Sequence, residues 1–200
     1  MISKKLNCIF IHIPRTGGHS IHKAFGYSVK KPLVDAQNRE LDHYRFIDYK
    51  QTTPNFNNYL CFSFVRNPWA KAFSEFIFLK HGTGMWPGRS RNRCVNPQSM
   101  TFKEFLRSIK NLDFEKINHF KKSHFIPQFN YLSDENSKID VDFIGKFENL
   151  QKDFTFFAKK LRGQIPGLKH LNKRKINHNH YSKYYDKSSI KLIESIYKID

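Results

Sequence analysis

Cysteine is scarce in this chain, with three in 200 residues. So small and odd a number argues against a disulfide framework, and no His or Cys spacing typical of a metal site occurs, so we expect no metal. Cys8 and Cys61 fall in apolar stretches, which predicts buried thiols. His178 and His180 flank an asparagine in a polar stretch, which we interpret as a solvated loop.

Long hydrophobic runs are also missing. No segment approaches the ~20 apolar residues that a membrane-spanning helix requires. The first apolar stretch is too short for a signal peptide and continues directly into a glycine-containing loop. We therefore expect a soluble protein without a membrane span.

Acidic residues are few, with 17 Asp and Glu against 35 Lys and Arg, and the formal net charge is +18. This excess favours an anionic partner, which could be a nucleotide, an acidic glycan, nucleic acid or an anionic membrane. No recognisable nucleic-acid-binding module such as RNP1 occurs. The length predicts one domain over residues 1–200, and 20 Phe and nine Tyr provide apolar material for its core.

The most informative segment, residues 8–21, reads C-I-F-I-H-I-P-R-T-G-G-H-S-I. It predicts a strand over residues 8–13, a tight loop and a helix from about residue 18 to 25. Free backbone N–H groups and the helix dipole at such a junction favour an anion, and Arg15 adds a cation. Glycines let the backbone approach a phosphate, and the Thr16 and Ser20 hydroxyls can donate. The alternative is that Gly17 and Gly18 only turn the strand into the helix.

A second strand, residues 59–65, leads into R-N-P-W-A-K-A-F-S. Asn67 is a suitable N-cap and Pro68 fits the first helical position, so Arg66 ends the strand and Ser74 lies two turns into the helix. Ligands of open α/β sheets bind beyond the carboxyl ends of the strands, so we expect Arg15 and Arg66 at one sheet edge. Alone, such an arginine is more often a surface charge.

Together the two segments resemble the sulfotransferase superfamily. I-P-R-T-G-G-H-S is similar to the 5′-phosphosulfate loop P-K-T-G-G-T-S of its carbohydrate branch, and V-R-N-P-W-x-K-x-x-S is similar to the 3′-phosphate motif R-N/D-P-x-x-R-x-x-S. The resemblance implies 3′-phosphoadenosine 5′-phosphosulfate (PAPS) as donor. It assigns the 3′-phosphate to Arg66 and Ser74, and the 5′-phosphosulfate to the loop residues Arg15, Thr16, Gly17, Gly18, His19 and Ser20. Lys is usual where this chain has Arg15, which the resemblance makes a catalytic cation.

Later blocks extend the resemblance. L-D-H-Y-R-F-I-D-Y is similar to H-x-S-Y-L-D-F of heparan and uronyl 2-O-sulfotransferases, which makes His43 the catalytic base. H-F-I-P-Q and D-F-I-G-K-F-E-N-L resemble blocks of the chondroitin branch, which suggests acceptor contacts for His124 and Gln128. Two basic stretches are equally compatible with a binding role and with solvated surface: Arg89, Arg91 and Arg93 for the acceptor, and Asn172, Lys173 and Arg174 for the nucleotide.

The resemblance implies a three-layer α/β fold like that of P-loop NTPases, with a central parallel sheet flanked by helices. Periodicity predicts a core strand over residues 143–146 and helices over residues 148–161 and 188–197. Thr101 and Glu104 predict a capping box that opens a helix through about residue 109.

We therefore expect a sulfotransferase that moves a sulfuryl group from PAPS to a hydroxyl of an acidic or neutral glycan. The alternatives are a P-loop-like nucleotide kinase, which lacks its Walker lysine here, and a basic nucleic-acid-binding protein. We expect a cytoplasmic enzyme of bacterial or viral type, or one of the Golgi lumen only if an anchor has been removed.

Overall fold

The computed structural model describes residues 1–27, 43–81, 99–113, 123–161, 165–168 and 179–200. Its contacts group into two compact units. The first comprises Met1–Arg66 and Gln128–Lys175, and the second comprises Asn67–Pro127 and Ile176–Asp200. The single domain expected from the chain length stays a prediction.

The first unit is built on a four-stranded sheet with the order β1-β2-β3-β4. β1 pairs antiparallel with β2, whereas β2, β3 and β4 run parallel. The strands are β1 Ile2–Ser3, β2 Cys8–Ile11, β3 Leu60–Val65 and β4 Phe143–Lys146. The near-continuous apolar runs of β2 and β3 fit strands that are covered on both faces. The expected α/β fold is confirmed, and the sheet is mostly parallel instead of wholly parallel because β1 pairs antiparallel with β2.

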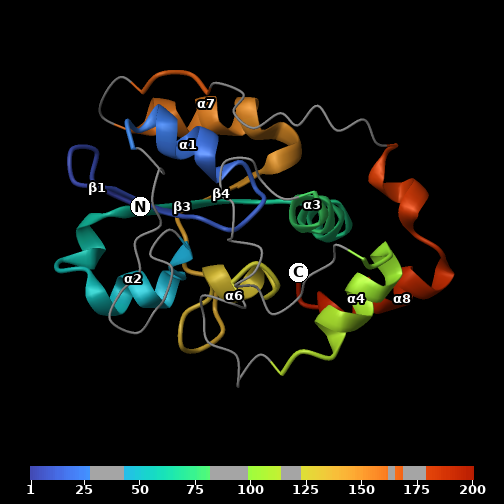
Figure 1. The fold of residues 1–200 in the computed structure, drawn as a ribbon. Coiled ribbons are helices and arrows are strands. Elements are labelled where there is room, and N and C mark those ends of the chain that lie inside the picture. Colours follow the sequence, from blue (N-terminus) through green and yellow to red (C-terminus); the bar gives the residue numbers. More distant parts are fainter. Residues whose placement is uncertain (28–42, 82–98, 114–122, 162–164, 169–178) are drawn as a thin grey trace. The chain divides into compact units, whose positions relative to one another are not determined.

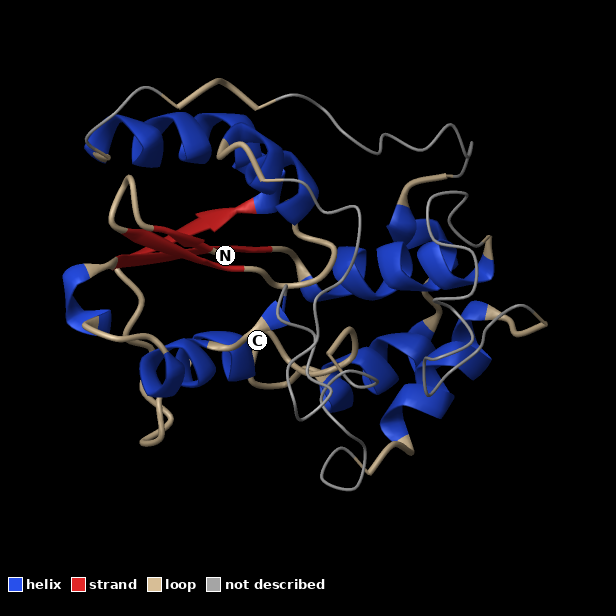
Figure 2. Ribbon diagram, turned by 60° about the vertical axis from the view of Figure 1, so that its left-hand side comes forward, coloured by secondary structure: helices blue, strands red, loops and turns tan. Residues whose placement is uncertain are grey.

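Helices cover both faces of this sheet (Figures 1 and 2). On one face lie α1 (Gly18–Ala24) and α7 (Leu150–Lys160), and on the other lie α2 (Phe46–Thr52) and α6 (Phe129–Leu132). The core under α1 and α7 is aromatic, with Phe62 stacked on Phe10 and tilted against Phe157 at ring-centroid distances of 5.1 and 4.2 Å. Large buried rings of this kind dominate core energetics, so they hold the sheet against α7.

Both described cysteines lie in this sheet as predicted. Cys8 on β2 and Cys61 on β3 are free and buried thiols. Burial raises the pKa of each thiol to about 12, so both stay protonated at neutral pH. They therefore act as small apolar core residues.

The regular structure in the described part of the second unit is helical. It contains α3 Pro68–Lys80, α4 Phe102–Lys110, the 3-10 turn η5 Tyr181–Tyr184 and α8 Lys187–Ile196. Its buried cluster includes Phe73, Phe76, Phe105 and Ile193. The predicted cap of α3 is confirmed, because the Asn67 side chain accepts from the Ala70 N–H at 3.1 Å. Pro68 occupies the first turn, where its missing N–H costs nothing.

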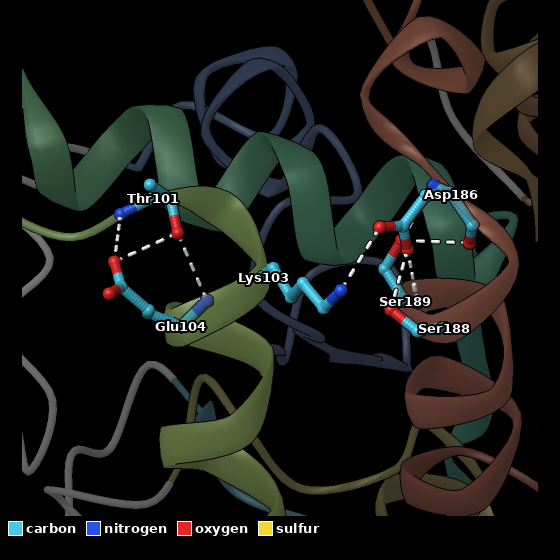
Figure 3. A network of polar contacts seen from close by, with 6 residues as sticks. All are labelled: Thr101, Lys103, Glu104, Asp186, Ser188 and Ser189. Atoms are coloured by element: carbon cyan, nitrogen blue, oxygen red, sulfur yellow. Dashed lines mark hydrogen bonds and ion pairs between the residues drawn. The ribbon is translucent and has the colours of Figure 1, made fainter.

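Two helix caps of the second unit are joined by an ion pair (Figure 3). The predicted capping box of α4 is present, since Thr101 and Glu104 exchange hydrogen bonds at 2.7 and 3.3 Å. Asp186 caps α8 by accepting from the Ser189 N–H at 2.7 Å, and Lys103 donates to its carboxylate at 3.1 Å. This ion pair links the first turn of α4 to the N-cap of α8.

Candidate functional site

The loop between β2 and α1 has an unusual backbone. Arg15 has φ 68° and Gly17 has φ 88°, both in the left-handed region. For an arginine this conformation is uncommon and is retained where surrounding contacts impose it. The buried Thr16 hydroxyl donates to the carbonyl of Ile13 at 2.8 Å, so its side chain closes the loop from inside.

Arg66 extends from the end of β3 to this loop. Its Nη1 donates to the carbonyl oxygen of Arg15 at 3.1 Å. Its guanidinium carbon lies 4.2 Å from the ring centroid of Phe147, which directly follows β4. Because β2, β3 and β4 are parallel, all three segments leave the sheet at the same edge, which we call the carboxyl edge. The structure therefore brings Arg15 and Arg66 together as the sequence predicts.

Gln128 holds the backbone of Arg66 in place. Its Oε1 accepts from the Arg66 N–H, and its Nε2 donates to the Arg66 carbonyl oxygen, both at 2.8 Å. The side chain is buried, and its two hydrogen bonds to the Arg66 backbone resemble the hydrogen bonds between neighbouring strands. In the structure Gln128 therefore positions the backbone of Arg66. Its contact with the acceptor, which the family resemblance suggests, stays a prediction.

A cluster of histidines lies beside the loop. The buried ring of His12 at the end of β2 is 4.4 Å from that of His43, 4.9 Å from that of His22 and 6.0 Å from that of His19, measured between centroids. The Nδ1 of His43 is 2.9 Å from the backbone oxygen of His12. A carbonyl only accepts, so Nδ1 carries the proton, and the lone pair of neutral His43 is on Nε2.

Two members of the cluster are held neutral. Burial lowers the pKa of His12 well below 6.5, and His43, His22 and His19 lower it further. Burial likewise lowers the pKa of His22 to about 3, with smaller contributions from the amino terminus, His19 and His43. His12 Nδ1 and His22 Nε2 are buried without a hydrogen-bond partner among the described residues. At neutral pH His12 and His22 are therefore uncharged and add no positive charge beside the loop.

Gly18 leaves the space that the His12 ring fills. A Cβ atom at Gly18 would lie 1.9 Å from Nε2 of His12. The His12 ring therefore requires the absence of a side chain at position 18, whereas the sequence suggested either the approach of a phosphate or a turn from strand to helix. Sequence reasoning missed His12, although a histidine in the apolar run just before the loop was a signal.

Ser74 and His124, also predicted from the sequence, belong to the second unit. Ser74 is half-buried on α3. The Nδ1 of buried His124 lies 2.9 Å from Oε2 of buried Glu75, and Lys71 Nζ donates to the His124 carbonyl at 3.3 Å. The contact with Glu75 fixes the orientation of the imidazole. The sequence analysis did not predict that Lys71 and Glu75 of α3 contact His124.

Six predicted site residues lie outside the described residues, namely Arg89, Arg91, Arg93, Asn172, Lys173 and Arg174. Within the described ranges, no group of three or more His, Cys, Asp or Glu side chains could hold a metal ion. None of the helices in the described part of the chain has the length and apolar character needed to cross a membrane.

Comparison with known proteins gives a family for the whole chain. Residues 1–200 match the family described as "Sulfotransferase family". An uncharacterized protein of Archaeoglobus fulgidus is 33% identical over 106 residues, which cover 53% of this chain and 70% of that protein. The chain, with its two arginines at one sheet edge, belongs to the sulfotransferase family.

Proposed function

We propose that this protein is a sulfotransferase that transfers the sulfuryl group of PAPS to a hydroxyl group of a carbohydrate acceptor. The observation that carries the proposal is the contact between Arg66 and the Arg15 carbonyl, because it gathers two cationic segments from separate strands at the carboxyl edge. Such an edge is where open α/β sheets bind ligands. We also propose the three-layer arrangement of P-loop NTPases for the complete fold.

The residues that the two sequence motifs assign to the donor provide cations and hydrogen-bond donors for a nucleotide with two separate anionic groups. Arg66, with Ser74 on α3, would hold the 3′-phosphate. The 5′-phosphosulfate would bind to Arg15, His19, Ser20 and the backbone N–H groups of Thr16, Gly17 and Gly18. The segment Asn172, Lys173 and Arg174 is proposed to add further contacts to the nucleotide.

The chemical step would proceed by in-line displacement. The acceptor oxygen attacks sulfur, the bond from sulfur to the bridging oxygen breaks, and adenosine 3′,5′-bisphosphate leaves. Nε2 of His43 would take the proton of the acceptor hydroxyl, because the contact of Nδ1 with the His12 carbonyl leaves Nε2 as the basic nitrogen. Sulfuryl transfer parallels phosphoryl transfer, in which positioning and charge stabilisation supply most of the catalysis.

Arg15 is the proposed electrophilic residue. It would stabilise the negative charge that grows on the bridging oxygen and the departing 5′-phosphate, so side-chain cations would suffice without a metal. Lys is usual at this position in the family. Arg presents a planar fork of donors where Lys presents a mobile point charge, and both carry the needed charge.

The acceptor is proposed to be a glycan. The net charge of +18 favours an acidic acceptor, and Arg89, Arg91 and Arg93 are the proposed contacts, together with His124 and Gln128. A neutral glycan would use fewer of these cations. Salt dependence of the KM for the acceptor would separate the two classes, because screening weakens charge steering.

Transfer of labelled sulfate from PAPS to a panel of acidic and neutral glycans tests the proposal. We expect incorporation into at least one glycan. A thermal-shift comparison runs in parallel, with adenosine 3′,5′-bisphosphate, ATP with magnesium, and a mixed oligonucleotide. A ligand that binds the folded state raises its apparent stability. A shift with ATP or the oligonucleotide but none with the bisphosphate would contradict the proposed donor.

A further inference from the structure

The guanidinium of Arg66 makes two contacts within the protein that the binding of a phosphate does not by itself require. It donates to the carbonyl of Arg15 at 3.1 Å, and it lies 4.2 Å above the ring of Phe147. The carbonyl that it reaches belongs to the residue with φ 68°. A residue in this uncommon conformation persists only where neighbouring groups impose it. Arg66 is therefore one of the groups that hold the loop in shape.

Phe147 determines where this guanidinium lies. In the register of the sheet Val65 pairs with Lys146, so Arg66 and Phe147 follow at matching positions on neighbouring strands. The turn at Phe147 is anchored because the Lys146 N–H donates to Asp153 at 2.8 Å. A cation over an aromatic face is attracted by the ring quadrupole. The ring thus provides a fixed platform for Arg66.

The same ring also lies against the loop. A Cβ atom at Gly17 would come within 3.5 Å of the Phe147 ring and within 2.7 Å of Leu150 Cδ2. Phe147 therefore lies beside the loop at Gly17, where it leaves little space for a side chain, and it contacts the guanidinium of Arg66. These contacts all lie within the first unit and join the two segments assigned to the two ends of the donor.

We propose that Arg66, supported on Phe147, organises the loop that binds the 5′-phosphosulfate, in addition to its own contact with the 3′-phosphate. Phe147 is then a positioning residue, and the two anionic ends of the donor are bound cooperatively. Coupling of this kind is reciprocal, so occupation of either end favours the conformation that binds the other. The inference rests on the proposed function, since it takes the donor to be PAPS.

A ligand without a 3′-phosphate separates the two roles of Arg66. The probe is adenosine 5′-phosphosulfate, titrated calorimetrically against the wild type, Arg66→Ala and Phe147→Leu. If Arg66 only bound the 3′-phosphate, neither substitution would affect this probe. We expect both to weaken its binding by about five- to tenfold, the range of a lost cation–π contact and a modest coupling.

Control variants distinguish the loss of the Phe147 ring from non-specific damage to the fold. Phe147→Tyr keeps the ring and should bind the probe within about twofold of the wild type, because tyrosine still offers a π face. Phe156→Leu makes the same change at an exposed phenylalanine of α7 and should also leave binding unaltered. The double variant Arg66→Ala/Phe147→Leu should lose no more affinity than the worse single variant, since both remove the same support.

The outcomes are distinguishable. Unchanged probe affinity in both Arg66→Ala and Phe147→Leu, with the wild type binding the probe and adenosine 3′,5′-bisphosphate, would overturn this inference alone. Fully additive losses in the double variant would also overturn it. A wild type that binds neither nucleotide would overturn the proposed function and the inference with it.

Discussion

The Nδ1 of His43 lies 2.9 Å from the backbone oxygen of His12, and this contact selects one tautomer of His43. The oxygen that selects it belongs to His12, the residue directly after β2, where the chain enters the loop proposed to hold the donor. A base that is hydrogen-bonded to the residue between β2 and the donor loop is positioned relative to this loop. Catalysis that depends on positioning requires the base to be held in place before the reaction begins.

His43→Ala should abolish transfer and leave nucleotide binding intact. Removal of a general base commonly costs ~10²–10⁴ in rate, and His43 is not among the residues assigned to the donor. The check is a pair of measurements on one purified variant, sulfate transfer and adenosine 3′,5′-bisphosphate binding. His81→Ala, at an exposed position after α3, is the matched control. Transfer near the wild-type rate would instead direct attention to His124.

Arg15→Ala should lower kcat more than donor affinity. The charge that Arg15 is proposed to stabilise grows only in the transition state, and loss of one such donor typically costs about 10²–10³ in kcat. Arg15→Lys should retain activity because it keeps the cation. Steady-state kinetics of the three proteins with PAPS provide the measurement, and an inactive Lys variant that still binds nucleotide would argue against the assignment.

Acid should destabilise the first unit through His22. The pKa of His22 is lowered to about 3 in the folded state, so between pH 6.5 and pH 3 the unfolded chain binds a proton that the folded chain excludes. The contribution of His22 to stability is therefore fully present above pH 6.5 and is lost as the pH decreases from 6.5 towards 3. At pH 5 this histidine alone should cost about 2 kcal/mol in the free energy of unfolding.

Urea unfolding at pH 7.5 and pH 5 measures this effect. His22→Phe keeps a buried ring next to Phe10 and cannot take a proton, so its stability should fall less over this interval. His12 is held neutral in the same way and should contribute in the same direction. An identical pH dependence in the wild type and His22→Phe would show that the histidine is not buried in its neutral form.

Gly18→Ala should destabilise the protein by about 1–3 kcal/mol, the usual cost of an overpacked core. The added methyl group would meet the His12 ring at 1.9 Å, and this ring has little room to move because it is buried. Gly167→Ala is the control, since nothing lies within 4 Å of its added Cβ. In a His12→Ala background the cost of Gly18→Ala should largely disappear, and a cost that persists there would exclude the clash as its cause.

Local patterns predicted much of the fold. Apolar runs located β2 and β3, and Asn67 with Pro68 located the start of α3. Residues 143–146 form β4 as expected, but β4 is the last strand of the described sheet and exposes Ile144 and Lys146, so it is not the core strand predicted. The helix expected over residues 148–161 begins as a 3-10 turn at Phe147–Asn149 and becomes α-helical at Leu150. Helix α2 was missed because its start depends on the Arg45–Asp48 contact, an interaction without the usual capping residues.

The site was predictable only in part. Parallel strands place their carboxyl ends at one edge, so the proximity of Arg15 and Arg66 followed from the pattern alone. The contacts of Gln128 and Phe147 with Arg66 could not be foreseen, because 62 residues separate Gln128 from its partner and strand register fixes Phe147. Tertiary packing of this kind leaves no periodic signal in the sequence.

Calorimetric titration of the wild type and Arg66→Ala with adenosine 3′,5′-bisphosphate tests the central claim most directly. A charge-assisted pair of this kind contributes ~2–5 kcal/mol, so we predict that affinity falls about thirtyfold or more while the protein remains folded. Arg107→Ala, which removes an exposed arginine of α4, should bind as the wild type does. Equal affinity of the wild type and Arg66→Ala for the bisphosphate would contradict a donor site at the carboxyl edge.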